Sequence, residues 1–288
     1  MSSKRKRKRD SRAVDARRSG IRSTAASGPP APQGGAHQPR IRYTDAHVVV
    51  VEKPAGLTTM RHPEEAAECG RRAQRYLAPT LNDLLPALLT RGRPGRQAPV
   101  FAVHRLDKDT SGLVVFSRST EAERNLGKQF RAHSIERRYL AIVRGRARPG
   151  RIESHLVSDR GDGRRGSAES GHGKRAITNV RVVQDLGEYT IVESRLETGR
   201  THQVRIHLGE SHTPICGERV YDRPPHGRPI PDRSGAKRLA LHAASLSFEH
   251  PVTGRRMAWE SSLPKDLQIL VDRLKRGRRQ GKDDPLAK

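Results

Sequence analysis

A polar segment that runs directly into an apolar one, His104–Arg118, constrains the fold of this chain more than any other stretch. Its first half places Asp107 between basic neighbours and is followed by a turn cluster of aspartate, threonine, serine and glycine. Leu113–Phe116 is then continuously apolar, which predicts a buried strand. The pattern holds a carboxylate on a loop anchored to a rigid strand, where reactive groups often lie. A turn-capping aspartate paired with its neighbours would explain the spacing equally well.

The same segment closely resembles the active-site motif of the RluA-type pseudouridine synthases. That motif reads His-Arg-Leu-Asp, two variable residues, then Thr-Ser-Gly-Leu, and every fixed position is matched between His104 and Leu113. In that family the aspartate is the catalytic residue. The resemblance therefore implies that Asp107 carries the chemistry.

A second motif, Thr198–Leu208, contains a cluster of arginine and histidine. It could begin a basic, solvated helix, and a metal site is not expected because His202 and His207 fall on different helical faces. The segment resembles the family motif Thr-Gly-Arg-Ser/Thr-His-Gln-Ile/Leu/Val-Arg, whose last arginine pairs with the catalytic aspartate. The resemblance implies that Arg205 faces Asp107, where a guanidinium would keep the carboxylate ionised and orient it.

Tyr139 lies in a predicted strand, where a tyrosine is usually a core residue. The stretch resembles the family pattern Lys/Arg-x-Tyr-Leu-Ala, whose tyrosine stacks on the target base and has been proposed to help remove its C5 proton. Aromatic residues make up only 3% of the chain, so few other stacking surfaces are available. Beyond Asp107, Arg205 and Tyr139, the resemblance implies substrate or RNA contacts for six further residues: Lys53, His104, Arg105, Thr110, Arg200 and His202.

Weaker matches place the resemblance over roughly residues 41–275. Val50–Gly56 resembles the first family motif, with Glu52 in place of the usual asparagine. Pro214–Glu218 ends in Gly-Glu, where the family commonly has Gly-Asp, so that Glu218 replaces an aspartate. We expect this extra methylene to alter the local loop and to leave catalysis unaffected.

Charge points to a polyanionic partner. The formal net charge is +26, from 57 basic and 31 acidic residues. Residues 1–40 carry +9 of it and residues 273–288 carry +5, so the body of the chain is basic as well. Nucleic acid is the first candidate, and the resemblance specifies RNA, either ribosomal or transfer RNA.

The organisation predicted is a disordered basic arm over residues 1–40, a catalytic domain over 41–275 and a basic tail over 276–288. The mixture of hairpin-linked strands with few helices indicates an α+β fold. The resemblance implies a large mixed, mostly antiparallel sheet with a central basic cleft. Strands are expected at 48–51, 113–116, 139–143, 176–183, 189–196, 246–248 and 257–259. Three helices are expected: one at 82–89, one that begins with a capping box at 120–123, and one at 264–274.

Two distant cysteines, Cys69 and Cys216, suggest a reduced, cytoplasmic protein. No apolar run approaches the roughly 20 residues of a membrane span, and the basic N-terminus lacks the apolar segment of a secretory signal. No dinucleotide or phosphate-loop motif is present, so no cofactor is expected. A monomer is expected.

The resemblance implies an isomerase that breaks the C1′–N1 bond of uridine and forms a C1′–C5 bond. Asp107 would attack C1′, add to C6 or deprotonate C2′, and the sequence leaves these open. A non-catalytic RNA-binding or ribosome-assembly factor is the main alternative. A hydrolase using Asp107 and Asp109 is a second, although two positions on a loop do not define the carboxylate separation that a glycosidase needs.

Overall fold

The computed structural model describes residues 38–61, 77–90, 99–168 and 171–280. Most of the arm expected over residues 1–40 lies outside these residues, as do Cys69 and residues 281–288 of the expected tail. The described residues all belong to one compact unit.

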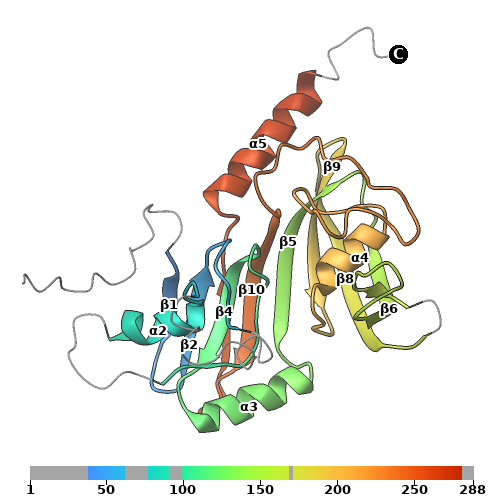
Figure 1. Cartoon of the computed structure of the whole chain (residues 1–288). Coiled ribbons are helices and arrows are strands. Elements are labelled where there is room, and N and C mark those ends of the chain that lie inside the picture. The colour runs from blue at the N-terminus through green and yellow to red at the C-terminus, as the bar shows by residue number, and fades with distance from the viewer. Residues whose placement is uncertain (1–37, 62–76, 91–98, 169–170, 281–288) are drawn as a thin grey trace, which may run out of the picture. The chain divides into compact units, whose positions relative to one another are not determined.

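One sheet of eleven strands organises the described residues (Figure 1). The strands are β1 (Arg40–Thr44), β2 (Val48–Lys53), β3 (Phe101–Ala102), β4 (Ser111–Ser117), β5 (Glu136–Arg144), β6 (Gly150–Val157), β7 (Gly166–Ser167), β8 (Lys174–Asp185), β9 (Tyr189–Leu196), β10 (Leu241–Glu249) and β11 (Arg256–Glu260). Their order is β1-β2-β4-β10-β5-β9-β8-β6-β7, with β3 on β4 and β11 on β10. Among these pairs β4–β10 is parallel and the others are antiparallel, which confirms the predicted α+β fold with a mixed, mostly antiparallel sheet.

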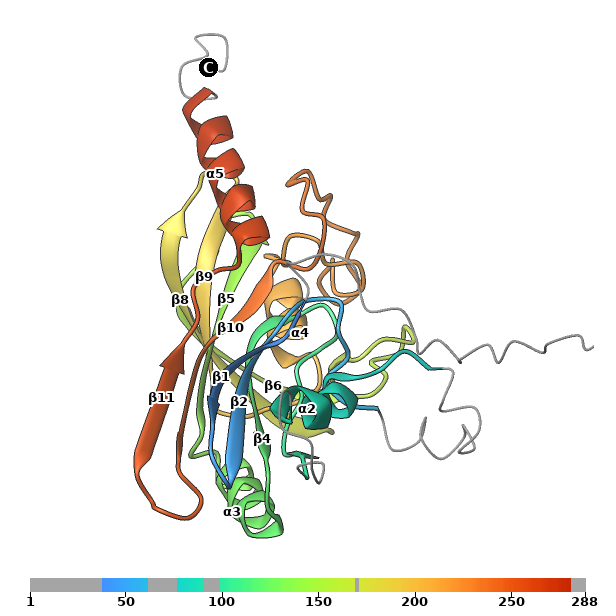
Figure 2. The ribbon, with the colours of Figure 1, turned by 90° about the vertical axis from the view of Figure 1, so that its left-hand side faces the viewer.

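Four helices accompany the sheet: α2 (Leu81–Leu89), α3 (Thr120–Arg131), α4 (Gln203–Glu210) and α5 (Lys265–Gln280). Helices α2 and α4 lie on the same face, whereas α3 and α5 lie at opposite ends of the strands (Figures 1 and 2). The capping box predicted at 120–123 is wrong by one residue, because Ser119 is the extended N-cap that accepts a hydrogen bond from Ala122. Among the described helices, none is long and apolar enough to cross a membrane.

The valine run of β2 is buried on both faces, as predicted. Val49 and Val51 pack into one hydrophobic cluster, and Val48 and Val50 into another. Successive side chains of a strand point to opposite faces, and β4 alternates in the same way between the two clusters. Apolar layers on both faces therefore hold β4 in place, together with the loop that precedes it.

The centre of the sheet depends on the short parallel contact between β4 and β10, which pairs Ser111 with His242 and Gly112 with Ala243. Gly112 has φ +116°, and a Cβ there would lie 2.3 Å from the carbonyl oxygen of Ala243. Glycine is required at this position because both the backbone angle and the close approach exclude a side chain. The contact brings the loop before β4 close to β10 and β5.

Several elements were not predicted or run further than predicted. Strands β1, β3, β6 and β7 have no counterpart among the strands expected from the sequence, and helix α4 had one only as an alternative, a basic, solvated helix start. Strand β10 begins at Leu241, five residues before the predicted strand, and α5 continues to Gln280, beyond residue 275, where the catalytic domain was expected to end.

Candidate active site

Asp107 lies on a loop that is fixed from both sides. Thr59 donates its hydroxyl to the carbonyl of Leu106 at 2.7 Å and accepts the amide of the same residue at 3.2 Å. The amide of Thr110 closes a turn onto the carbonyl of Asp107 at 3.1 Å. The Asp107 side chain, 17% exposed, is thus presented at the surface of a cavity by a rigid loop.

Arg205, on the first turn of α4, holds the carboxylate. Its Nη1 donates to Asp107 Oδ2 at 3.2 Å, across 98 positions of sequence. Its Nε and Nη2 donate to the two carboxylate oxygens of Glu218, at 2.7 and 2.8 Å. The structure therefore brings together the predicted pair, and a planar guanidinium serves two carboxylates at once.

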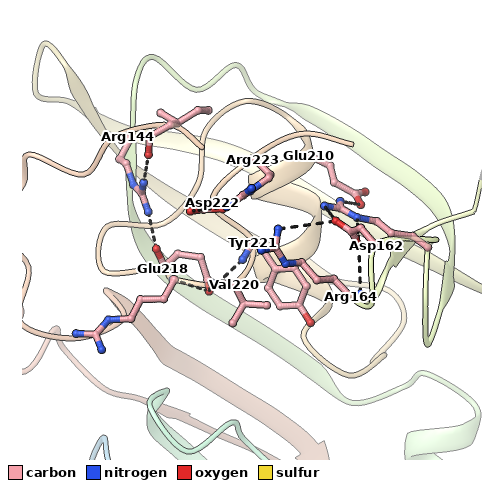
Figure 3. A network of polar contacts seen from close by, with 12 residues as sticks. Arg144, Asp162, Arg164, Glu210, Glu218, Val220, Tyr221, Asp222 and Arg223 are labelled. Atoms are coloured by element: carbon pink, nitrogen blue, oxygen red, sulfur yellow. Dashed lines mark hydrogen bonds and ion pairs between the residues drawn. The ribbon is translucent and has the colours of Figure 1, made fainter. Parts of the chain in front are cut away.

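Glu218 is the main site residue that sequence reasoning missed. Its side chain is 1% exposed, and Oε1 also accepts the amides of Arg219, Val220 and Tyr221. Burial raises the pKa of Glu218, but Arg205 and these amides more than offset it, so the pKa lies below its usual value. Figure 3 shows Arg144 donating to the carbonyl of the same residue. The sequence signal for Glu218 was its position in the family motif, where aspartate is common after glycine. From the sequence, the change to glutamate was expected to affect the loop geometry alone.

His202 approaches the other oxygen of Asp107. It is the N-cap of α4, with φ 58°, and its Nε2 lies 3.7 Å from Asp107 Oδ1. Its Nδ1 lies 2.7 Å from the hydroxyl of Tyr221, whose ring lies under the guanidinium of Arg205. Burial lowers the pKa of His202 and outweighs the opposing charge of Asp107. Tyr221, a second residue not foreseen, orients this imidazole.

A cavity of about 530 Å³ opens over these groups. Asp107 is its one acidic lining residue among the described residues, and Tyr139, 8% exposed, lines it from β5. Burial raises the pKa of Tyr139, with Asp107 adding to the rise and Arg137 opposing it. Five arginines also line the cavity: Arg105, Arg131, Arg137, Arg200 and Arg205.

Three of the expected RNA contacts fit this position. Arg105 is exposed at the cavity. Thr110 is buried there, and its hydroxyl has no hydrogen-bond partner within the described residues. Arg200 also lines the cavity and donates its Nε to the carbonyl of Arg175 at 3.0 Å.

Two expected contacts need correction. Lys53 is 1% exposed, and its ammonium donates to the carbonyls of Pro54, Leu57 and Lys108, so it ties two loops together and does not reach RNA. His104 lines the cavity but uses Nε2 to accept the amide of Val115, and its ring packs on Phe130. Burial, aided by Arg137, lowers the pKa of His104 to about 3, so it adds no positive charge for a phosphate.

His207 points away from the cavity, since its two ring nitrogens contact Thr178 and Ser154. It diverges from His202, as its position on the helix predicted. No group of three histidine, cysteine or acidic side chains suited to a metal occurs in the part of the chain that the structure describes.

Replacing Lys53 with methionine is expected to destabilise the protein by about 3 kcal/mol, because three partly buried carbonyls lose their donor. Burial lowers the pKa of Lys53 from 10.5 to about 7, although the charges of Asp107 and Asp109 oppose this shift. The unfolded chain then binds more protons between these values, so wild-type stability should gain from this group as pH rises. Urea unfolding from pH 6 to 10 measures both effects, with exposed Lys108→Met as control. If the stability of the wild type and of Lys53→Met depended on pH in the same way, the expected gain in wild-type stability with rising pH would be contradicted.

Comparisons with known proteins agree with this geometry. A family model described as RNA pseudouridylate synthase matches residues 47–210. The ribosomal large subunit pseudouridine synthase D of Zymomonas mobilis is 37% identical over 237 residues, which cover 81% of this chain and 72% of that protein. The protein of the same name from Pseudomonas aeruginosa is 36% identical over 247 residues, covering 83% and 72%.

A solved structure, Human RNA Pseudouridylate Synthase Domain Containing 4, has a TM-score of 0.63 with 23% identity and covers 82% of this chain and 92% of that chain. Human RNA Pseudouridylate Synthase Domain Containing 1 has a TM-score of 0.57 with 22% identity and covers 86% and 98%. At these identities the likeness concerns the fold, which is the same sheet-centred α+β arrangement.

Proposed function

The chain belongs to the RNA pseudouridylate synthase family, and from this premise we propose that Asp107 is the catalytic residue of the isomerisation. The protein is an RNA pseudouridine synthase. The single observation that carries the assignment of Asp107 is its position: it is the one carboxylate that lines the active-site cavity among the described residues, and Arg205 holds it at 3.2 Å.

The reaction balances within the nucleoside. The C1′–N1 bond breaks, uracil turns, a C1′–C5 bond forms, and the proton lost from C5 is matched by one gained at N1. The proposed first step is made by the carboxylate group of Asp107 at C1′, C6 or C2′. Arg205 orients the carboxylate for this step, and because Glu218 takes its other two donors, the guanidinium keeps one fixed direction.

The remaining lining supports the binding of an exposed nucleotide. Tyr139 offers its ring as a stacking surface for the base. Arg105 and Arg200 supply cations for phosphates, while Thr110 and His202 supply polar groups near Asp107. These side chains would make the cavity the basic cleft of the enzyme. A uridine paired within RNA must leave its stack to reach a site of this kind.

Large-subunit ribosomal RNA is the proposed target, in preference to transfer RNA, because it is named for the relatives that are 35–37% identical. We place the enzyme in the cytoplasm as a monomer. Its buried Cys216 is a free thiol, and one chain supplies every group of the cavity.

The test is to incubate the purified protein with unmodified large-subunit ribosomal RNA and, separately, with unmodified transfer RNA, and to map pseudouridine by chemical labelling. New pseudouridine is expected at discrete positions of the ribosomal RNA and is expected to be absent with Asp107→Asn. Modification of transfer RNA alone would overturn the proposed target but not the reaction. Equal modification by Asp107→Asn would overturn the catalytic assignment.

Tyr139→Phe is expected to bind target RNA as the wild type does, whereas Tyr139→Leu should bind it about 5- to 160-fold more weakly. Stacking of a base on an aromatic ring is worth roughly 1–3 kcal/mol, and phenylalanine keeps the ring. Fluorescence anisotropy gives the affinities, and urea unfolding of both variants controls for lost packing. Equal affinity of the two variants would place Tyr139 in the core and away from the base.

A further inference from the structure

A second cavity, of about 470 Å³, lies beside the active site. The end of β6, the start of β8 and the segment before α4 form its walls. Leu156, Val157 and Ile206 make it partly apolar, and Arg165, Lys174 and Arg200 supply its charges. No acidic side chain lines it among the described residues. Such a lining suits an anion that carries an apolar body.

The three cations of this second cavity differ from their neighbours. Arg160 and Arg164 pair with Asp162, and Arg151 and Arg175 pair with Glu153. Within the described residues, no ion pair involves Arg165, Lys174 or Arg200. The four neighbouring arginines are ion-paired, so the cations of this region that have no ion-pair partner among the described residues lie in the second cavity.

The two cavities share a wall, Gly199–Thr201, and Arg200 lines both. Arg165 is close enough to the active site for its charge to lower the pKa of His202. Burial and the charges of Asp107, Arg205 and Glu218 have larger effects on that pKa. An RNA strand that places one nucleotide over Asp107 and crosses this wall would bring its next phosphate among these cations.

We propose that the second cavity binds a nucleotide that flanks the target uridine, with its phosphodiester on Arg165, Lys174 and Arg200 and its ribose or base against the aliphatic wall. The inference rests on the proposed function, in that the active-site cavity holds the target nucleotide. The ligand class is single-stranded RNA. The lining contains no aromatic ring among the described residues, so recognition there would depend on charge and shape rather than stacking.

The chain offers a matched pair of double variants. Arg165→Ala/Lys174→Ala removes two cations from the second cavity. Arg164→Ala/Arg175→Ala removes the same formal charge at the adjacent positions, from residues that are ion-paired; Lys174 and Arg175, adjacent on β8, point to opposite faces. The probe is a fluorescent oligouridylate of about nine nucleotides, within the usual site size for single strands. Its affinity for each protein is measured over a series of salt concentrations.

The cavity variant is expected to lower the log–log salt slope by up to about 0.7, the value for one phosphate contact on a single strand. The wild-type advantage should then grow up to about 2.6-fold between 200 and 50 mM salt. The control variant should keep the wild-type slope. Equal slope losses in the two variants would mean a general electrostatic field and would overturn the proposal, as would an unchanged slope in the cavity variant.

Uridine monophosphate, tested alone, separates a flanking-nucleotide site from a free-nucleotide site. Binding as tight as that of the oligomer would overturn the proposal. The outcome is distinguishable from that of the proposed function, because these measurements need no turnover. Pseudouridine formation by the wild type together with an unchanged salt slope in the cavity variant would overturn this inference alone. Loss of slope in the cavity variant without pseudouridine formation by the wild type would overturn the target or catalytic assignment.

Discussion

Asp107→Asn is expected to reduce pseudouridine formation by at least about 10³-fold, the range for removing a group that acts as nucleophile or general base. Asparagine has nearly the same shape, but its amide is far less nucleophilic and basic than a carboxylate. Arg205 keeps both hydrogen bonds to Glu218 in this variant, so no charged group of the site is left without a counter-ion. We therefore expect a stability change below about 1 kcal/mol.

Single-turnover release of tritium from uridine labelled at C5, at saturating RNA, measures the chemical step of Asp107→Asn, and urea unfolding measures its stability. Asp109→Asn is the matched control, since Asp109 lies on the same loop, is exposed and does not line the cavity. Its rate should stay within about twofold of wild type, as for a surface substitution. Turnover by Asp107→Asn within tenfold of wild type would show that another group starts the reaction.

Arg205→Ala should affect activity and stability together. It removes the partner of Asp107 and leaves the carboxylate of Glu218, 1% exposed, without its cation. Breaking a buried ion pair from one side costs about 3–5 kcal/mol. The pKa of Glu218 should rise in this variant, because burial then acts with less opposition. Turnover should fall about 100-fold or more, as the carboxylate loses its orientation.

The double variant Arg205→Ala/Glu218→Gln separates the two effects. Removing both charges should restore much of the lost stability, since no unpaired carboxylate remains buried. Activity should stay low, because Asp107 still lacks its guanidinium. Arg205→Lys should recover activity only in part, as a point charge cannot serve two carboxylates in one plane. Recovery of turnover along with stability in the double variant would make Arg205 a structural residue.

The elements that could be read from the sequence are those with strong local patterns. The continuous apolar runs of β2 and β4 predicted strands with both faces buried, and both clusters of the core are built on them. The sequence offered helix α4 only as a solvated alternative, whereas six of its eight residues are buried, so it has no polar face to produce a helical period. Its N-cap, His202, also lacks a side-chain capping bond, which removes the usual start signal.

The site divides in the same way. The motifs around Asp107 and Arg205 predicted the pair that the structure brings to 3.2 Å. The RNA contact of Lys53 was implied by the family resemblance, and nothing local in the sequence reveals three carbonyls converging on its ammonium. Glu218 and Tyr221 reach the site through contacts between distant segments, and no spacing rule describes such contacts.

The strand order has a consequence for synthesis of the chain. Strand β10, Leu241–Glu249, is inserted between β4 and β5, so the strand that follows Asp107 and the strand that carries Tyr139 are joined through a segment that is translated long after both. Chains emerge from the ribosome N-terminus first. A nascent chain carries Asp107, the proposed catalytic residue, long before it has Arg205, Glu218 or the strand that closes the sheet. An enzyme that cleaves glycosidic bonds in RNA would therefore stay inert beside the RNA of the ribosome that makes it, until its last central strand has been translated.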